Sequence, residues 1–363
     1  MQDARTFADN PSADTPPSDT GASSPALSND PQEILQTETG CGGEHATVPT
    51  KPTTLTLGGD LNTMALQNPE EPFFIAPPYD KLLRGTKEMP IGLYQLYKAS
   101  AAQLTRLHYS EKSVKHVKAL LRALADHDFV QFDARPTASY RSPYYYVLGN
   151  KGVEYVNSLG FSVSDSFQPN KEIGKGYLHL LHQMGVNDVL ISAALLKQRV
   201  TGFVLADVKL GRELVDKPFH AMRLGKPYGI LPDLFLDFRQ ELQGGKQRRT
   251  LVLLEHDRGT EQEEVIRRKV HAYTTMIKSE WYKTQFNMNS ITVAFTTFEG
   301  EKRRDKLRAW AKEELKDEDT SLVATFLFTT QLQPPDPACI WSHPCWYSPF
   351  MEAKPASMLG GEL

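Results

Sequence analysis

Three acidic residues stand at the ends of two apolar segments in the second half of the chain. Glu255 and Asp257 close the apolar run that begins at Leu251, and Asp233 opens an earlier apolar segment directly after Pro232. Residues two apart on a β-strand point to the same face, so Glu255 and Asp257 are predicted to share one face of a strand end. Neighbouring strands lie only about 5 Å apart, so Asp233 can join them. This pattern predicts a three-carboxylate cluster, a candidate site for Mg²⁺ or Mn²⁺.

Four further residues are candidates to complete this site. Asp188 and His182 lie on one predicted helix, where Asp188 is the better oxygen ligand and His182 is alternatively a buried histidine hydrogen-bonded to the backbone. Lys269 and Tyr273 are one turn apart on a later helix, so they can flank the site together, although Tyr273 also fits a core position. His256 alternates with its two acidic neighbours and is predicted to point away from them.

The elements that must position these residues follow from hydrophobic periodicity. Apolar residues at helical spacing predict a long helix at 177–199, and short apolar runs predict strands. Strands are expected at about 202–205, 233–238, 251–254, 291–295 and 322–328, and further helices after the capping box at 260–263 and at 302–315. This order predicts an α-β-β-β-α-β core with one extra helix before the last strand. Its mixed sheet is expected to be covered on both faces.

A second group of elements precedes this core and is rich in basic residues. Helical spacing is present at 91–97, 101–107 and 111–127, and two alternating strands at 129–132 and 144–148 are joined by a polar loop. Three helices followed by a hairpin is the order of a winged helix-turn-helix. The basic residues of the third helix and the loop are Lys112, Lys115, Lys118, Arg122, Arg135 and Arg141. They predict DNA binding through the major groove and the adjacent backbone, although a winged helix that contacts proteins would also leave them solvated.

Composition sets the limits of the predicted domains. Residues 1–78 are rich in Pro, Ser, Thr, Asp and Gly without apolar periodicity, which predicts a disordered leader. The winged helix is assigned to 79–162, a linker to 163–174, the α/β domain to 175–332, and a Pro-rich C-terminal tail to 333–363.

The net charge of −3 conceals an uneven distribution of charge. Residues 1–70 carry two basic residues against ten acids, whereas residues 80–150 carry eleven basic residues against six acids. A second basic run at 302–308 is interpreted as a solvated helix face. The chain has no apolar run of about 20 residues and no secretion signal, so a cytoplasmic protein without a membrane partner is expected.

The acidic motifs resemble those of known families. Pro232-Asp233 with Glu255-His256-Asp257 resembles the P-D…(D/E)-x-K signature of restriction-endonuclease-like nucleases, with Asp257 where those enzymes have lysine. The larger arrangement, over about residues 89–330, is similar to the replication-relaxation family of plasmid proteins. The motifs that carry this resemblance after the winged helix are His182-x-x-x-x-Asn187-Asp188, Pro232-Asp233, Glu255-x-Asp257-x-Gly259-Thr260-Glu261 and Lys269-x-x-x-Tyr273.

The resemblance implies a DNA-binding protein of plasmid replication and DNA relaxation, with a restriction-endonuclease-like second domain. Its expected partners are double-stranded plasmid DNA and proteins of a replication or transfer complex. If the domain is catalytic, the resemblance implies a metal-dependent DNA endonuclease in which Asp233, Glu255 and Asp257 hold Mg²⁺ or Mn²⁺. Lys269 then replaces the missing lysine, or Asp257 binds a second metal ion.

Other functions fit the same residues. Glu255, Asp257 and Arg258 can instead form a structural ion-pair network, and the protein is then a non-catalytic transcriptional regulator or assembly adaptor. A nuclease of DNA repair or of defence against invading DNA would share the chemistry. Winged helices often form homodimers, but no heptad pattern in this chain predicts one.

Overall fold

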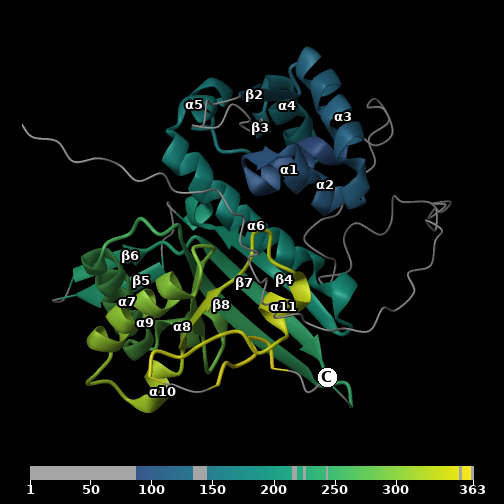
Figure 1. Cartoon of the computed structure of the whole chain (residues 1–363). Coiled ribbons are helices and arrows are strands. Elements are labelled where there is room, and N and C mark those ends of the chain that lie inside the picture. The colour runs from purple at the N-terminus through teal and green to yellow at the C-terminus, as the bar shows by residue number, and fades with distance from the viewer. Residues whose placement is uncertain are drawn as a thin grey trace, which may run out of the picture. The chain divides into compact units, whose positions relative to one another are not determined.

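The computed structural model describes residues 87–133, 145–214, 219–223, 226–242, 244–350 and 354–360 (Figure 1). All of them lie in one compact unit, residues 54–363. The predicted leader at 1–78 and the two predicted DNA-binding residues Arg135 and Arg141 lie outside the described residues.

The first group of elements combines helices with a small antiparallel sheet. The elements are α1 (Glu88–Leu96), β1 (Ala99–Ser100), α2 (Ala101–His108), the 3-10 turn η1 (Glu111–Ser113), α3 (Val114–Asp126), β2 (Val130–Asp133), β3 (Tyr145–Leu148) and α4 (Asn150–Ser158). The strand order is β1-β3-β2. A capping box starts α2, because Ser100 and Gln103 exchange side-chain to backbone hydrogen bonds. Val117, Leu121 and Leu124, on one side of α3, are buried.

The second group of elements forms the larger sheet and its covering helices. The elements are α5 (Pro169–Gly174), α6 (Tyr177–Arg199), β4 (Phe203–Leu210), η2 (Gly211–Leu214), β5 (Phe219–Arg223), β6 (Lys226–Ile230), β7 (Leu234–Glu241), β8 (Gln247–Asp257), α7 (Glu263–Lys278), α8 (Trp281–Phe286), β9 (Thr292–Thr297), α9 (Glu301–Glu314), α10 (Thr320–Val323), β10 (Phe326–Thr330) and α11 (Pro337–Trp341). Among the described helices, none is both long and apolar enough to span a membrane.

The five-stranded sheet has the order β10-β9-β8-β7-β4 and is mixed, as the sequence predicts. β4, β7 and β8 are antiparallel neighbours, whereas β8, β9 and β10 run parallel. Alternate residues of β8 enter different cores: Leu254 packs in the cluster that contains Val189 of α6, and Leu253 packs in the cluster that contains Ile266 of α7. The sheet is therefore covered on both faces, by α6 on one and by α7 and α9 on the other (Figure 1).

Several element boundaries differ from those expected. The connection between β4 and β7 contains the hairpin β5–β6, and the predicted linker at 163–174 contains α5. The capping box expected at Thr260 is wrong, because α7 begins at Glu263. The segment before α7 is fixed by other hydrogen bonds: the Glu261 amide donates to Asp257, and the Glu261 carbonyl accepts from Arg303. The limits 79–162 and 175–332 stay predictions.

The described residues after 332, within the predicted Pro-rich C-terminal segment, pack against the second group of elements. Trp341 and Trp346 are fully buried, and Phe328 of β10 pairs with Tyr347 through two backbone hydrogen bonds. The indole nitrogen of Trp341 donates to Ser192 Oγ of α6 at 3.0 Å. Two buried tryptophans supply enough apolar area to anchor this Pro-rich segment.

Replacing Ser192 by alanine is expected to lower the free energy of unfolding by about 1–3 kcal/mol, because the fully buried Trp341 indole N–H then has no acceptor. Urea denaturation followed by tryptophan fluorescence measures this loss. Ser321→Ala, at an exposed position on α10, is the control and is expected to change stability by less than about 0.5 kcal/mol. Equal stability of the two variants would contradict an anchoring role for this bond.

Candidate functional site

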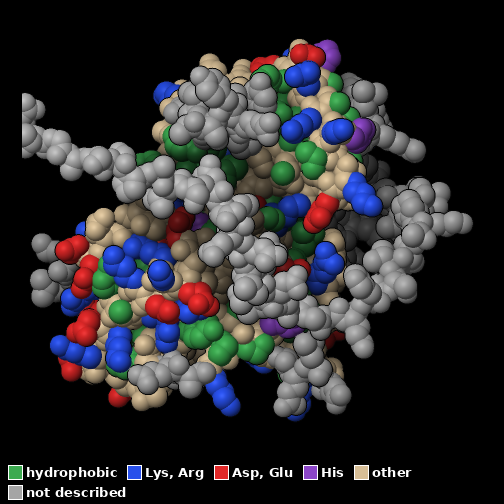
Figure 2. Space-filling model, in the orientation of Figure 1, with side chains coloured by type: hydrophobic (Ala, Val, Ile, Leu, Met, Phe, Trp, Pro, Cys, Tyr) green, Lys and Arg blue, Asp and Glu red, His purple; other side chains and the backbone are tan. Residues whose placement is uncertain are grey.

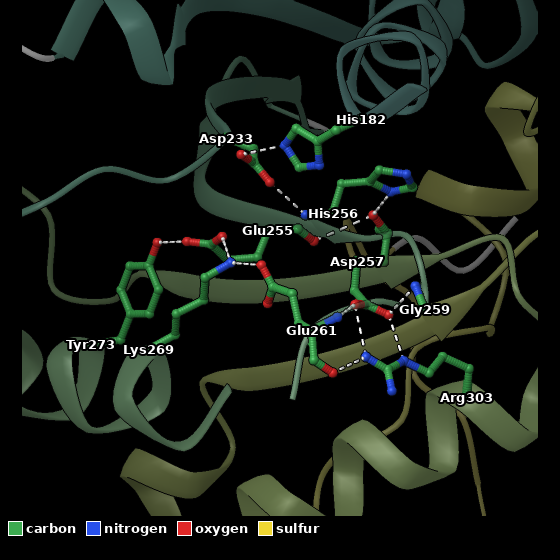
Figure 3. A network of polar contacts seen from close by, with 11 residues as sticks. His182, Asp233, Glu255, His256, Asp257, Gly259, Glu261, Lys269, Tyr273 and Arg303 are labelled. Atoms are coloured by element: carbon green, nitrogen blue, oxygen red, sulfur yellow. Dashed lines mark hydrogen bonds and ion pairs between the residues drawn. The ribbon is translucent and has the colours of Figure 1, made fainter. Parts of the chain in front are cut away.

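The site lies where β7 begins and β8 ends (Figure 3). Leu234 pairs with Leu254 across the antiparallel strands, so Asp233, which directly precedes β7, lies opposite Glu255. β8 then leads into the crossover helix α7 and the parallel strand β9. Ligands of open α/β sheets bind at the carboxyl ends of parallel strands, so the position itself favours a functional site.

Asp233 and His182 form the first pair of the site. His182 Nε2, on α6, lies 2.9 Å from Asp233 Oδ1, and the His256 backbone N–H donates to Asp233 Oδ2 at 2.8 Å. Burial alone would lower the pKa of His182, but the hydrogen bond and charge of Asp233 raise it above its ordinary value. For Asp233 the signs are reversed: burial would raise its pKa, but the hydrogen bond and charge of His182 lower it. The pairing therefore favours an imidazolium beside a carboxylate, and both side chains are partly open to solvent.

Glu255, Lys269 and Tyr273 form the second group. Lys269 Nζ lies 2.9 Å from Glu255 Oε2 and 2.7 Å from Glu261 Oε1, and the Tyr273 hydroxyl donates to Glu255 Oε1. The Glu255 side chain is only 5% exposed, and this burial raises its pKa to about 7 although Lys269 acts in the opposite direction. Burial would lower the pKa of Lys269, but the charges of Glu255, Asp233 and Glu261 raise it, so Lys269 stays protonated.

Asp257 belongs to a different contact. Arg303 of α9 binds it with two hydrogen bonds, of 2.6 Å from Nε and 2.8 Å from Nη2, and the Gly259 amide donates to it at 2.8 Å. Burial would raise the pKa of Asp257, but these hydrogen bonds lower it. The described part of the chain holds no group of three or more His, Cys, Asp or Glu side chains placed to bind a metal ion. The three-carboxylate cluster expected from the sequence is thus not assembled here, because Asp257 faces Arg303.

The structure does not bring Asp188 to Asp233 and Glu255, the acidic pair of the site. Its carboxylate accepts hydrogen bonds from Arg106 at 2.7 Å, Gln103 at 2.9 Å and Gln333 at 2.8 Å. The helix position that the sequence suggested for a metal ligand therefore connects α2, α6 and the segment after β10.

His256 lies on the other face of β8, as its alternation with Glu255 predicts (Figure 3). Its Nδ1 is 3.1 Å from Thr296 Oγ1, and burial lowers its pKa to about 4. Gly185 of α6 makes room for the imidazole, because a Cβ there would come within 2.1 Å of His256 Nε2.

Two residues of the site lie in segments that the sequence marked, but their contacts were not predicted. Glu261 is the second acid beside Lys269, and Arg303 is the partner of Asp257. Arg303 lies 46 residues after Asp257 inside a basic run, so only the folded arrangement of α9 reveals its role.

The oxygens of Asp233 and Glu255 are the donor type that Mg²⁺ and Mn²⁺ prefer. Magnesium is commonly held by one or two carboxylates, while water and substrate phosphate fill the other positions. Asp233 and Glu255 supply oxygens of this type, and the half-buried Lys269 lies 2.9 Å from Glu255 Oε2.

Comparison with known proteins places the chain in one family. The family described as replication-relaxation matches residues 93–292, from α1 to the first residue of β9 and more than half of the chain. Neither the curated proteins nor the solved structures gave a match. The chain therefore belongs to the replication-relaxation family.

Proposed function

We propose that this protein is a cytoplasmic DNA-binding protein of plasmid replication and DNA relaxation, and that α3 contacts duplex DNA. Family membership supports the biological role. The basic face of α3 supports the binding mode: Lys112 just before the helix and Lys115, Lys118 and Arg122 within it are exposed, opposite the buried Val117–Leu121–Leu124 side. Figure 2 shows Lys and Arg side chains along this exposed side. Such side chains neutralise DNA phosphates.

The arrangement around α3 is compatible with a winged helix. Helices α1, α2 and α3 with the sheet β1-β3-β2 supply its elements, and α3 takes the place of the recognition helix that enters the major groove.

Neutralising the α3 face tests this binding mode. In the variant K112Q/K115Q/K118Q/R122Q, the slope of log affinity against log salt is expected to fall by about 1 for each lost phosphate contact. Affinity for any duplex sequence is expected to drop at least about tenfold at low salt, because phosphate contacts carry no sequence information. Fluorescence anisotropy with a labelled duplex over a salt series measures both quantities.

The matched control is K197Q/R199Q/K312Q/K316Q, which removes four exposed positive charges from α6, α9 and the residue after Leu315. It is expected to change affinity much less. If both variants lose the same affinity and slope, binding depends on overall charge and the assignment to α3 is wrong.

We further propose that the Asp233–Glu255 site hydrolyses phosphodiester bonds in DNA. The observation that carries this proposal is the position of Lys269: its ammonium group lies 2.9 Å from Glu255 Oε2 although it comes from α7. Lys269 thereby supplies the positive charge that restriction-endonuclease-like nucleases obtain from a lysine at the position of Asp257. Burying charged side chains is costly in free energy, and clusters of buried charges with shifted pKa values are typical of functional sites.

In this site Asp233 and Glu255 would hold Mg²⁺ or Mn²⁺, which lowers the pKa of bound water and neutralises phosphate charge. Lys269 orients the attacking water and stabilises charge that develops on the phosphate. Burial would lower the pKa of His182, but its hydrogen bond to Asp233 raises it, so His182 adds a second basic group beside Asp233. Tyr273 fixes the Glu255 carboxylate from the buried side.

A second function has its own support. The carboxylates Asp233, Glu255 and Asp257 already have the cationic partners His182, Lys269 and Arg303. Paired in this way, they are suited to a non-catalytic scaffold that carries the DNA-binding elements into a replication or transfer complex. A plasmid-cleavage assay separates the two functions.

A further inference from the structure

A cavity of about 160 Å³ lies next to the site, on the α6 side of the sheet. Its walls come from Leu181, Met184 and Gly185 of α6 and from residues that follow three parallel strands. These are Arg258 after β8, Phe298 and Glu299 after β9, and Gln333 beyond β10. His256 also lines the cavity, while its backbone amide donates to Asp233. The cavity is thus one residue away from the acidic pair.

The lining suits a flat aromatic ring. The Phe298 and His256 rings lie 4.7 Å apart between centroids, and Phe298 is half-buried, so it is fixed but accessible. Leu181 and Met184 supply apolar contacts from α6. A cavity of roughly 150 Å³ admits one benzene ring, so 160 Å³ suits a single-ring base.

The surroundings add charge and exposed apolar surface. Arg258, partly exposed, lines the cavity and donates to the backbone carbonyl of Leu178. Leu178 and Leu332, which precedes Gln333, are 65% and 88% exposed. An arginine beside an accessible aromatic ring is the combination that single-stranded nucleic-acid sites use, because bases stack on aromatic rings and phosphates pair with cations.

We propose that this cavity binds one unpaired pyrimidine base of a DNA strand whose backbone passes the acidic pair. This inference rests on the proposed function and names its substrate class: single-stranded or locally unpaired DNA. A base within a duplex is stacked and cannot enter the cavity, so binding selects a strand that is already open or a base that has left the stack.

The test compares two single strands of equal charge, a labelled 12-nucleotide oligothymidylate and a 12-nucleotide strand with abasic sugars. Anisotropy is measured with the full chain in EDTA, so that no cleavage occurs. The wild-type protein is expected to prefer oligothymidylate. Phe298→Ala is expected to weaken oligothymidylate binding about 5- to 150-fold, the effect of losing one stacked base, and to leave abasic-strand binding unchanged.

Leu181→Trp provides an independent variant, since it fills the cavity from α6 and is expected to remove the same preference. Phe350→Ala changes an exposed phenylalanine outside the cavity and is the matched control. The proposal is overturned if the wild-type protein binds both strands equally, or if Phe298→Ala and Leu181→Trp keep the preference while folded. Circular dichroism checks folding.

This outcome is separate from the proposed function. Failure of the base site leaves plasmid cleavage and duplex binding by α3 intact, whereas failure of the nuclease proposal leaves the preference for oligothymidylate in EDTA. The two results are therefore read independently.

Discussion

Asp233→Asn and Glu255→Gln are each expected to reduce metal-dependent nicking of supercoiled plasmid by about 100- to 1000-fold, the range typical of losing one group that stabilises a charged transition state. Each amide keeps the shape of the side chain but removes the negative charge that would hold the cation. The measurement is the conversion of supercoiled plasmid to open circle or linear DNA with Mg²⁺ or Mn²⁺. Cleavage that persists unchanged in both variants would place the chemistry elsewhere.

Lys269→Met is expected to cause a loss of similar size, because no strand lysine replaces it. Lys278→Met is the matched control: it lies on the same helix, but its side chain is 55% exposed and pairs with Glu318 on the surface. Control activity is expected to equal that of the wild-type protein.

The same assay tests the scaffold function. Plasmid that is retarded on the gel but uncut in every lane, including the wild-type lane, would show a DNA-binding protein whose acidic pairs are structural. Neutralising the α3 face would then still weaken retardation, so DNA binding and cleavage are judged separately.

The local parts of this site were predictable from the sequence. The apolar run before Glu255 fixes the strand, and the helical periodicity around Lys269 and Tyr273 fixes the apolar side of α7. A short connection, from Asp257 at the end of β8 to Glu263 at the start of α7, lets the helix fold back so that Lys269 and Tyr273 reach Glu255. Tyr273 combines both expected roles, because its ring is fully buried while its hydroxyl reaches Glu255.

The distant contacts were not predictable in the same way. Strand alternation places Asp257 on the same face as Glu255, but alternation does not show which side chain arrives from α9. Likewise the spacing of Asp188 from His182 is compatible with one site, yet α2 presents Arg106 to Asp188. Tertiary packing decides which side chains from distant elements come close, and each carboxylate pairs with the basic side chain that packing places beside it.

Arg303→Met is expected to lower the free energy of unfolding at about pH 7 by about 3–5 kcal/mol, because it leaves a buried carboxylate without its cation. The Asp257 side chain is 2% exposed and that of Arg303 is 11% exposed, so water replaces little of the lost interaction. Urea denaturation measures the change. Arg267→Met is the control: that side chain is 42% exposed, so water screens its pairs with Glu263 and Glu314, and the variant is expected to lose much less stability than Arg303→Met.

The pH dependence of this loss identifies its cause. Burial alone would raise the pKa of Asp257, but Arg303 lowers it, so the stabilisation is complete above the unfolded value of about 3.9 and is lost as pH falls through the lower folded value. Without Arg303, burial is expected to raise the pKa above the unfolded value, and the variant then takes up a proton as pH falls. The stability difference between wild type and variant should therefore narrow from about pH 7 to about pH 4. A difference that stays constant over this range would show that Arg303 stabilises α9 by packing against Trp310, whose ring lies 5.1 Å from its guanidinium carbon, and not by pairing with Asp257.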